Sequence, residues 1–373
     1  MIDRFGWQEI GVVVDVIKKG ELSSFFKDFR GGEQIQAFEK EFAEYLGATS
    51  CISVANGTVS LEIALKAINI KDYEVITTPL SFIATGTAIL AAGGNPVFID
   101  IDPHTLNIDP AKIEENITEK TIAILPVSLL GYPAPMDKIC KIAKKNLLYV
   151  VEDAAQALGS TINGKKIGTW GYAGSFSFQF TKQITTLGEG GAIVTNNPDL
   201  AEKCRKIRNH GNYYSDLDDS VSTNARLTEA AAAFGRMQLR KLDEFNKIQK
   251  ENAEYFLDEA PLEKLGLELV YRDDPYFKST FLLIPTYAKD EEIRNKLLGD
   301  LKMCGISQGV PGHNVGYYSK LIYQNPIFKD AKRDCPIAEE AIKRIVLWDV
   351  HRWREQKDME ALISFLNWMV KEK

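Results

Sequence analysis

Cysteine and histidine are scarce in this chain of 373 residues. The five cysteines lie 89, 64, 100 and 31 residues apart, and the four histidines are as widely scattered. Zinc sites and iron–sulfur clusters draw their ligands from short motifs such as Cys-x-x-Cys, and the chain has no such motif. We therefore expect no metal site. An odd, dispersed set of cysteines also indicates reduced thiols and a cytoplasmic protein.

Positive charge is not in excess either. Lysine and arginine number 45 against 51 aspartates and glutamates, which gives a formal net charge of −6. This balance offers no general attraction to a nucleic-acid backbone or an anionic membrane, so we expect neither as a partner. A local basic pocket for a small acidic substrate remains compatible with it. The composition, 45% apolar and 26% charged, is that of a globular protein long enough for two or three domains.

Long apolar runs are missing as well. The N-terminal stretch lacks the apolar core of a secretory signal. The longest segment without charge, residues 75–99, is broken by Pro79, Gly93, Gly94 and Pro96. A strand, a loop, a short helix and a second strand account for that segment better than a membrane span does. We expect neither a signal peptide nor a membrane-spanning helix.

The chain does have a regular alternation of short apolar runs with helical periodicity. A helix is predicted over 33–46, where apolar residues recur every three or four positions and Gly47 follows as a C-cap. Strands are predicted over 51–54, 74–77, 96–99, 122–127, 147–151, 174–178 and 192–195. Helices are predicted between them over 58–68, 82–92, 136–144 and 199–210. This order is typical of an α/β fold, with a mostly parallel central sheet and helices on both faces.

The pattern changes in the second half of the chain. A surface hairpin is predicted at Asn163-Gly164, and the proline-free segment 227–256 predicts one helix of about 30 residues, roughly 45 Å long, that could connect two domains. The elements predicted beyond that helix are strands over 267–270 and 280–285 and helices over 290–303, 337–346 and 355–371. We predict a large α/β domain over 1–245 and a small C-terminal α+β domain over 246–373.

Polar residues gather at the ends of predicted strands, where open α/β sheets bind ligands. The dinucleotide motif G-x-G-x-x-G, the P-loop and the G-x-S-x-G elbow are all absent. Gly57 and Thr58 open a helix directly after a strand and could hold a phosphate, although a simple helix cap is the alternative. Asp153 ends a very apolar strand and would be costly to bury without a cation such as a protonated ring nitrogen. It could instead cap the next short helix or form a local salt bridge.

Lys182 is the sharpest candidate, because a predicted strand runs into it and a glycine-rich turn, 188–191, follows. A lysine amine becomes a nucleophile when burial or nearby positive charge lowers its pKa from ~10.4. The alternatives are a solvated surface lysine and a plain hairpin turn. Asn224, just before the long helix, could direct its amide at an anion or simply cap the helix. Together these groups meet the needs of pyridoxal 5′-phosphate (PLP): an amine for its aldehyde, a carboxylate for its ring nitrogen and donors for its phosphate.

Several motifs follow one another in a fixed order along the chain. They are Asn56-Gly-Thr58, Val151-Glu-Asp-Ala-Ala-Gln156, Phe176-Ser-Phe-x-x-x-Lys182, Gly188-Glu-Gly-Gly191, Arg208-Asn-His-Gly211 and Asn224-x-Arg-Leu-Thr-Glu229. With them the chain resembles the DegT-type sugar aminotransferases, which are PLP enzymes of the aspartate aminotransferase fold (fold type I). The resemblance runs from about Gly32 to the C-terminus.

The resemblance implies a role for each matching position around the cofactor ring. Lys182 would form the Schiff base with PLP, and Asp153 would pair with the ring nitrogen. Gln156 would hydrogen-bond the ring hydroxyl, and Phe82 would stack on the ring.

The phosphate and its surroundings are implied in the same way. Gly57, Thr58 and Ser177 would hold the phosphate. Asn224 would reach the phosphate bound in the neighbouring subunit, so that a homodimer with shared active sites is implied.

The substrate side of the pocket is where the resemblance is less complete. His313 and Tyr317 lie in a Pro-x-His-x-x-x-Tyr-Tyr stretch that approaches the substrate in the family. Gln179 stands where histidine or another residue is often found, Ala225 replaces a frequent tyrosine, and Ala173 replaces a frequent aspartate. Gln179 and Ala225 make the transfer of a substrate by analogy unsafe.

The reaction implied by the resemblance has two halves in a ping-pong mechanism. An amino acid, expected to be glutamate or glutamine, gives its amino group to the cofactor, and a keto-sugar, expected to be nucleotide-linked, then receives it. Lys182 would carry a proton between donor and cofactor, while Asp153 keeps the ring nitrogen protonated.

Other readings of the same residues stay open. Family members that eliminate a hydroxyl replace the lysine with histidine, and Lys182 argues against that reaction. A cyclitol ketone is a rival substrate. The chain could also be a PLP-binding regulator without turnover, although neither a helix-turn-helix nor the basic patch of a DNA-binding regulator is evident.

Overall fold

The computed structural model describes residues 4–23, 25, 28–212, 222–303, 320–350 and 356–371. Its largest feature is a sheet of eight strands in the order β1-β9-β8-β5-β4-β2-β3-β13. These strands are β1 (Ser50–Val54), β2 (Glu74–Thr77), β3 (Asn95–Ile99), β4 (Thr121–Leu125), β5 (Tyr149–Asp153), β8 (Ala173–Ser177), β9 (Gly191–Thr195) and β13 (Lys332–Asp334). β9 runs antiparallel to both β1 and β8, and every other pair in this sheet is parallel. The predicted α/β fold with a mostly parallel sheet is confirmed.

Helices cover both faces of this sheet. One layer consists of α2 (Glu33–Leu46), α5 (Met136–Lys145) and α7 (Glu229–Glu259), and the other of α3 (Gly57–Ala67), α4 (Ala84–Ala91) and α6 (Pro198–Arg208). Successive side chains of a strand point to opposite faces. In β2, Ile76 therefore packs in the first layer and Val75 in the second. Burial on both faces explains why these strands are apolar throughout.

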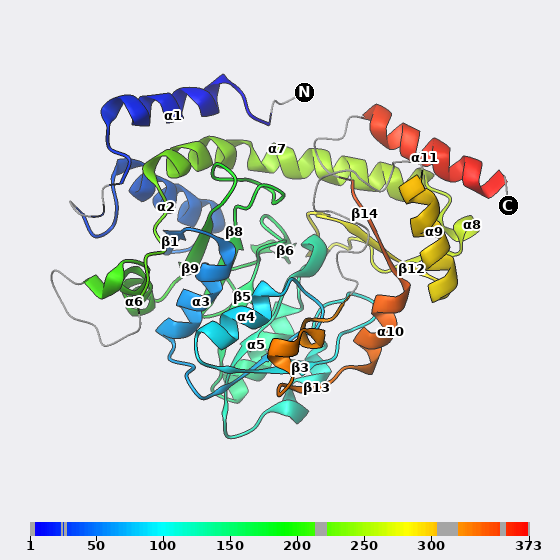
Figure 1. The fold of residues 1–373 in the computed structure, drawn as a ribbon, viewed down its shortest axis with the longest axis horizontal. Coiled ribbons are helices and arrows are strands. Elements are labelled where there is room, and N and C mark those ends of the chain that lie inside the picture. The colour runs from blue at the N-terminus through cyan, green and yellow to red at the C-terminus, as the bar shows by residue number, and fades with distance from the viewer. Residues whose placement is uncertain are drawn as a thin grey trace.

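The long helix α7 belongs to two cores. It is one uninterrupted helix of 31 residues that crosses the molecule, as the proline-free segment predicts (Figure 1). The side chain of Thr228 caps its start. Leu242 and Phe245 pack under the large sheet, whereas Phe256 and Leu257 pack in a second core formed by the C-terminal part of the chain.

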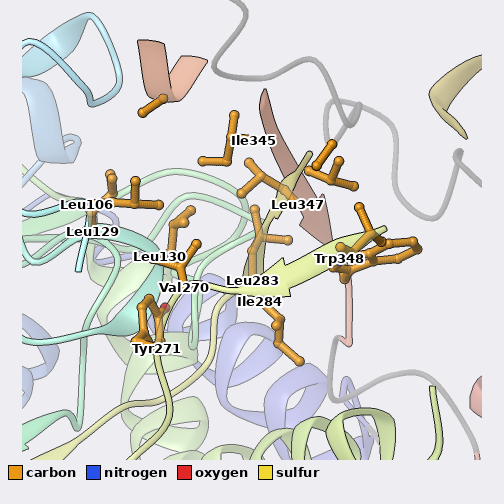
Figure 2. Packing of buried hydrophobic residues seen from close by; sticks show 14 of the residues in the cluster. Leu106, Leu129, Leu130, Val270, Tyr271, Leu283, Ile284, Ile345, Leu347 and Trp348 are labelled. Atoms are coloured by element: carbon orange, nitrogen blue, oxygen red, sulfur yellow. The ribbon is translucent and has the colours of Figure 1, made fainter. Parts of the chain in front are cut away.

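That second core is built around a small antiparallel sheet of three strands. Its elements are β10 (Leu267–Leu269), β12 (Ile284–Ala288), β14 (Ile345–Trp348), α8 (Leu262–Leu265), α9 (Glu291–Met303), α10 (Pro336–Arg344) and α11 (Gln356–Lys371). Figure 2 shows Leu129 and Leu130, from the segment after β4, close to Leu283, Ile284 and Leu347 of this core. β13 also comes from the C-terminal part and pairs with β3 of the large sheet. The domain boundary at residue 245 stays a prediction, and it falls within α7.

Most predicted elements of the first half are present. The helix predicted over 33–46 coincides with α2. The hairpin predicted at Asn163-Gly164 joins β6 (Thr161–Ile162) to β7 (Lys165–Lys166). Both turn residues have positive φ, 47° and 79°, which is the conformation that two-residue hairpins of type I′ require. A short strand, β11 (Phe277–Lys278), pairs with β6 and was not predicted.

Two predictions beyond α7 were wrong in their bounds. The strand expected over 280–285 begins only at Ile284, because the backbone before it bonds to a loop: the Thr280 N–H donates to the Gly131 carbonyl at 3.2 Å. The helix expected over 337–346 ends at Arg344, and the next four residues form β14, which pairs with β12. An apolar run that ends a helix and begins a buried strand cannot be divided by periodicity alone.

The N-terminal helix α1 (Trp7–Lys19) was not predicted. It is held on α7 by the buried Glu9, whose carboxylate lies 2.6 Å from the Lys241 ammonium. Its outer side exposes Trp7, Ile10 and Ile17 to 85%, 47% and 58%. Neither α1 nor another helix within the described ranges is long and apolar enough to cross a lipid bilayer.

Glu229 joins the starts of two helices. It lies in the first turn of α7, and its buried carboxylate accepts hydrogen bonds from the backbone N–H groups of Gly32, Gln34 and Ile35, at 2.8, 2.9 and 3.4 Å. These donors belong to the start of α2, where the N-cap is a glycine without a side-chain acceptor. A carboxylate here satisfies donors that the helix itself leaves unpaired, and it opposes the positive end of the helix dipole.

We expect Glu229→Ala to lower the free energy of unfolding by about 2–4 kcal/mol, because buried N–H groups lose their charged acceptor. Glu33→Ala is a matched control: this residue also begins α2, but it is exposed and pairs with Lys19 at the surface. Its loss should cost about 0–1 kcal/mol. Urea denaturation of both variants measures the difference, and equal midpoints would refute the role of Glu229.

Candidate functional site

A pocket of about 720 Å³ lies at one edge of the large sheet. The carboxyl ends of β1, β5 and β8 meet there, since these three strands run in the same direction. The structure brings seven of the predicted residues together in its wall: Gly57, Thr58, Phe82, Asp153, Gln156, Ser177 and Lys182. This is the edge at which open α/β sheets bind ligands.

One end of the pocket is formed by the start of α3. The side chain of Asn56 caps this helix by accepting a hydrogen bond from the Val59 N–H at 2.9 Å. Gly57 and Thr58 occupy the first turn, whose N–H groups have no acceptor within the helix. Ser177 ends β8 directly opposite, and a Cβ at position 57 would lie 2.7 Å from the Ser177 Cβ. Backbone donors, a hydroxyl and a helix N-terminus together suit a phosphate group.

The glycine-rich turn serves the backbone around this end. A Cβ at Gly191 would lie 2.5 Å from the backbone carbonyl carbon of Asn56, so β9 can approach the start of α3 only without a side chain there. Gly188 has a φ of 101°, which is in the left-handed region. The turn thus combines a close backbone approach with a positive φ. The close approach is to the chain itself.

Asp153 is the last residue of β5, and its side chain is buried. Burial raises the pKa of this carboxyl, because a charge loses its hydration there. Three groups oppose the shift: the Thr85 hydroxyl donates to Oδ2 at 2.8 Å, the Ala155 N–H donates to Oδ1 at 3.2 Å, and the Lys182 charge attracts the anion. The local helix cap that was the alternative role for Asp153 accounts for only one of these three.

Lys182 follows β8 in a loop that its neighbours hold in place. Its N–H donates to the Gln179 carbonyl at 2.8 Å, and the Gln179 side-chain oxygen accepts from both the N–H and the hydroxyl of Thr181. The Lys182 side chain is half-buried in the pocket wall. Desolvation lowers the pKa of its amine to about 8, although the Asp153 carboxylate acts in the opposite direction. Lys182 is therefore not a solvated surface lysine.

Gln156 and Phe82 complete the wall around Asp153. The Gln156 Oε1 accepts a hydrogen bond from the Leu130 N–H at 3.0 Å, so its Nε2 is the part of the amide that can donate to a ligand. Gln183 holds the same segment by donating to the Gln156 carbonyl at 2.7 Å. The Phe82 side chain is 47% exposed although it lines the pocket, and an exposed aromatic face suits a flat ring.

One predicted residue that the structure describes, Asn224, is not part of this pocket. Asn224 is exposed and pairs with Asn209 in an isolated bridge, and it is not among the residues that line the pocket in this chain. Its neighbour Ala225 is buried, with the Ala225 N–H donating to the Arg208 carbonyl at 3.0 Å. His313 and Tyr317 lie outside the described residues.

Ser81 and Thr85 are among the hydroxyl groups of the pocket wall that sequence reasoning missed. Both line the pocket, and Thr85 contacts the predicted carboxylate directly. The available signal was their place in the chain: both are hydroxyl residues within three positions of Phe82, and Thr85 lies in the first turn of α4, which begins at Ala84.

A lysine of lowered pKa and a buried carboxylate share one pocket at the carboxyl edge of a mostly parallel sheet, which is the arrangement expected of a fold type I PLP-dependent enzyme. The DegT/DnrJ/EryC1/StrS aminotransferase family model matches residues 16–367, and the chain belongs to this family. The predictions of family, fold and aminotransferase activity are confirmed.

Individual relatives agree with this assignment. The chain is 36% identical, over 340 residues and 90% of each chain, to the dTDP-3-amino-3,6-dideoxy-alpha-D-galactopyranose transaminase of Aneurinibacillus thermoaerophilus. It is similar to S. venezuelae DesV, solved in complex with a ketimine intermediate, with a TM-score of 0.88, 28% identity, and 98% of this chain and 94% of that chain covered. It is also similar to NtdA from Bacillus subtilis, solved with bound cofactor PMP, with a TM-score of 0.86, 28% identity, and coverage of 98% and 82%.

The lowered pKa of Lys182 predicts how its amine reacts in the protein without cofactor. With a pKa of about 8, roughly one amine in ten is neutral at pH 7, against about one in three thousand at the ordinary 10.5. Modification of Lys182 by an acylating reagent, followed by mass spectrometry, should therefore rise with pH around a midpoint near 8. Lys247, which is exposed on α7, is the control. A Lys182 yield that does not rise around pH 8 would contradict burial as the cause.

The contact between Gly57 and Ser177 predicts a loss of cofactor binding on substitution. Gly57→Ala forces two backbone segments apart at the proposed phosphate end, and we expect the affinity for PLP to fall by roughly tenfold or more. Gly11→Ala in α1 is the control, because a Cβ there meets nothing within 4 Å. Equilibrium titration with PLP measures both variants, and an unchanged affinity for Gly57→Ala would rule out this end as the phosphate site.

Proposed function

We propose that this chain transfers an amino group from glutamate or glutamine to a nucleotide-linked keto-sugar, with PLP as cofactor, in a ping-pong reaction. The observation that carries the proposal is the pair of Lys182 and Asp153 in one pocket. The dTDP-sugar transaminase among the relatives supports the choice of a nucleotide-linked substrate.

The residues present fit PLP. The pocket offers about 720 Å³ and contains the donor set that this cofactor needs: an amine, a carboxylate, a ring-facing aromatic side chain and a helix start for a phosphate. Gly57 keeps that start free of a side chain that would fill the space before Ser177. When bound, PLP supplies an electron sink for the carbanion that forms when the donor loses its α-proton.

Lys182 and Asp153 are the side chains proposed to move or hold protons in this reaction. The Lys182 Nζ has a pKa of about 8. Near neutral pH it would therefore take a proton from the donor's α-carbon and carry it to the cofactor. The Asp153 carboxylate would hold a proton on the cofactor's ring nitrogen by charge attraction, and this preorganised charge would strengthen the electron sink. Gln156 would orient the ring through its amide.

Other polar residues of the pocket wall support the proposal that the amino-group acceptor is a sugar. Glu62, Gln179, Thr181 and Glu189 also line the pocket, and such polar groups can hydrogen-bond the hydroxyls of a sugar. His313 and Tyr317 would approach the same substrate. The departures at Gln179 and Ala225 still leave the exact sugar to experiment.

We propose that the active unit is a homodimer. Asn224 is exposed rather than turned into the pocket of its own chain, which fits a role at the phosphate of the neighbouring subunit. The exposed apolar residues on α1, Trp7, Ile10 and Ile17, fit a surface that a second subunit covers.

The described cysteines carry free thiols, which suits the cytoplasm as the place of the reaction.

The test follows the visible absorbance of the protein with PLP. Glutamate or glutamine should remove the band of the lysine-bound cofactor, and the correct keto-sugar nucleotide should restore it with formation of an amino-sugar. Lys182→Ala should lose both the band and turnover, whereas Lys247→Ala should retain them, because Lys247 is exposed on α7. Near wild-type turnover in Lys182→Ala would refute the assignment. An inosose that restored the band in place of all keto-sugar nucleotides would show the acceptor to be a cyclitol ketone.

A further inference from the structure

The segment that begins α4 approaches Asp153 with two hydroxyl groups. Thr85 is the second residue of α4 and is fully buried, and its hydroxyl donates to Asp153 Oδ2 at 2.8 Å. The Ser81 hydroxyl lies 2.9 Å from the Thr85 hydroxyl and is also buried. Both residues line the cofactor pocket, and neither is among the site residues predicted from the sequence.

We propose that Thr85 is a positioning residue that keeps the Asp153 carboxylate ionised and oriented toward the cofactor's ring nitrogen, and that Ser81 fixes the direction of the Thr85 hydroxyl. This proposal rests on the function proposed above, because it assigns Asp153 to that nitrogen.

The number of protons fixes the direction of this chain of hydrogen bonds. A threonine hydroxyl has one proton, and an ionised carboxylate has none to give. Thr85 must therefore donate to Asp153, and its oxygen remains as the acceptor. In the contact between the two hydroxyls Ser81 is then the donor, so the order is Ser81 to Thr85 to Asp153.

The same hydrogen bonds also fix the carboxylate in space. Thr85 occupies one position on Oδ2 and the Ala155 N–H occupies one on Oδ1, so the rotation of the carboxyl group is restricted. Each oxygen keeps a second lone pair that can face the pocket. An aspartate without these donors would be free to rotate and to take up a proton.

The charges around Asp153 show why a hydroxyl matters here. Burial raises the pKa of Asp153, and the charged side chains that share its pocket are Lys182, Glu62 and Glu189. Only Lys182 among them stabilises the anion, and it is itself neutral part of the time. The Thr85 hydroxyl and the Ala155 N–H do not titrate at these pH values, so they stabilise the anion whatever the state of Lys182.

The main test compares Thr85→Val with Thr85→Ser. Valine has nearly the shape of threonine but lacks the hydroxyl, whereas serine keeps it. In the full chain without cofactor, the Asp153 pKa can be followed by carbon NMR of the carboxyl groups, with Asp153→Asn to assign the signal. We expect Thr85→Val to increase the proton affinity of Asp153 by roughly tenfold, since one hydrogen bond to a charged group is lost. Thr85→Ser should restore the original value.

The pH dependence of activity in the protein with PLP gives a second test. Activity requires ionised Asp153, so it is lost as the pH falls through the pKa of this group, and Thr85→Val should move that acid limb to higher pH. We expect kcat of the donor half-reaction to fall by roughly 10- to 100-fold with KM nearly unchanged, because the Thr85 hydroxyl acts through Asp153, to which it donates. Thr85→Ser should recover most of kcat, and Ser81→Ala should shift the acid limb less but in the same direction.

Several results would overturn the proposal. Unchanged proton affinity and unchanged acid limb in Thr85→Val would do so, as would equal losses in the valine and serine variants, which would indicate a packing role. If Thr85→Val does not fold, Thr85→Ala serves for the same two measurements. Failure of the wild-type protein to transfer amines would refute the proposed function alone, since the NMR shift of Asp153 does not depend on turnover.

Discussion

The site depends on two opposite charges that are both withdrawn from water. Burial favours the neutral form of each, raising the pKa of Asp153 and lowering that of Lys182, while their mutual attraction opposes both shifts. The balance decides the chemistry, because an amine that can lose its proton near neutral pH and a carboxylate that stays charged are both needed. The Thr85 hydroxyl and the Ala155 N–H are neutral hydrogen-bond donors that stabilise the negative charge of Asp153. Neither of them takes the proton of Lys182.

The main chain places these groups with little freedom. Asp153 ends β5, and the register pairs it with Ser175 of the neighbouring strand β8, so the loop that carries Lys182 begins beside the carboxylate. Gln179 holds the backbone just before Lys182 from within that loop. Gly191 lets β9 pass close to the start of α3, which positions the proposed phosphate end. Strand ends and glycines thus position the backbone around the pocket.

The sequence predicted the parts of this arrangement that depend on local pattern. Apolar runs buried on both faces gave the strands of the large sheet, and the motifs around Asp153 and Lys182 gave the pocket. Thr85 was missed because its role comes from a contact between α4 and β5 that spacing along the chain does not reveal. The strand expected over 280–285 was misplaced for a similar reason, since the backbone of Thr280 bonds to the distant Gly131. Periodicity predicts which face is buried, but not which partner buries it.

The helix α7 has a consequence for the integrity of the whole chain. Leu242 and Phe245 complete one core and Phe256 and Leu257 complete the other, on a single run of backbone hydrogen bonds. A cut near its middle would leave each fragment with an uncovered apolar stripe and a frayed helix end. The two halves therefore share one folding unit, and damage to the C-terminal core also removes support from the part of the molecule that carries the pocket.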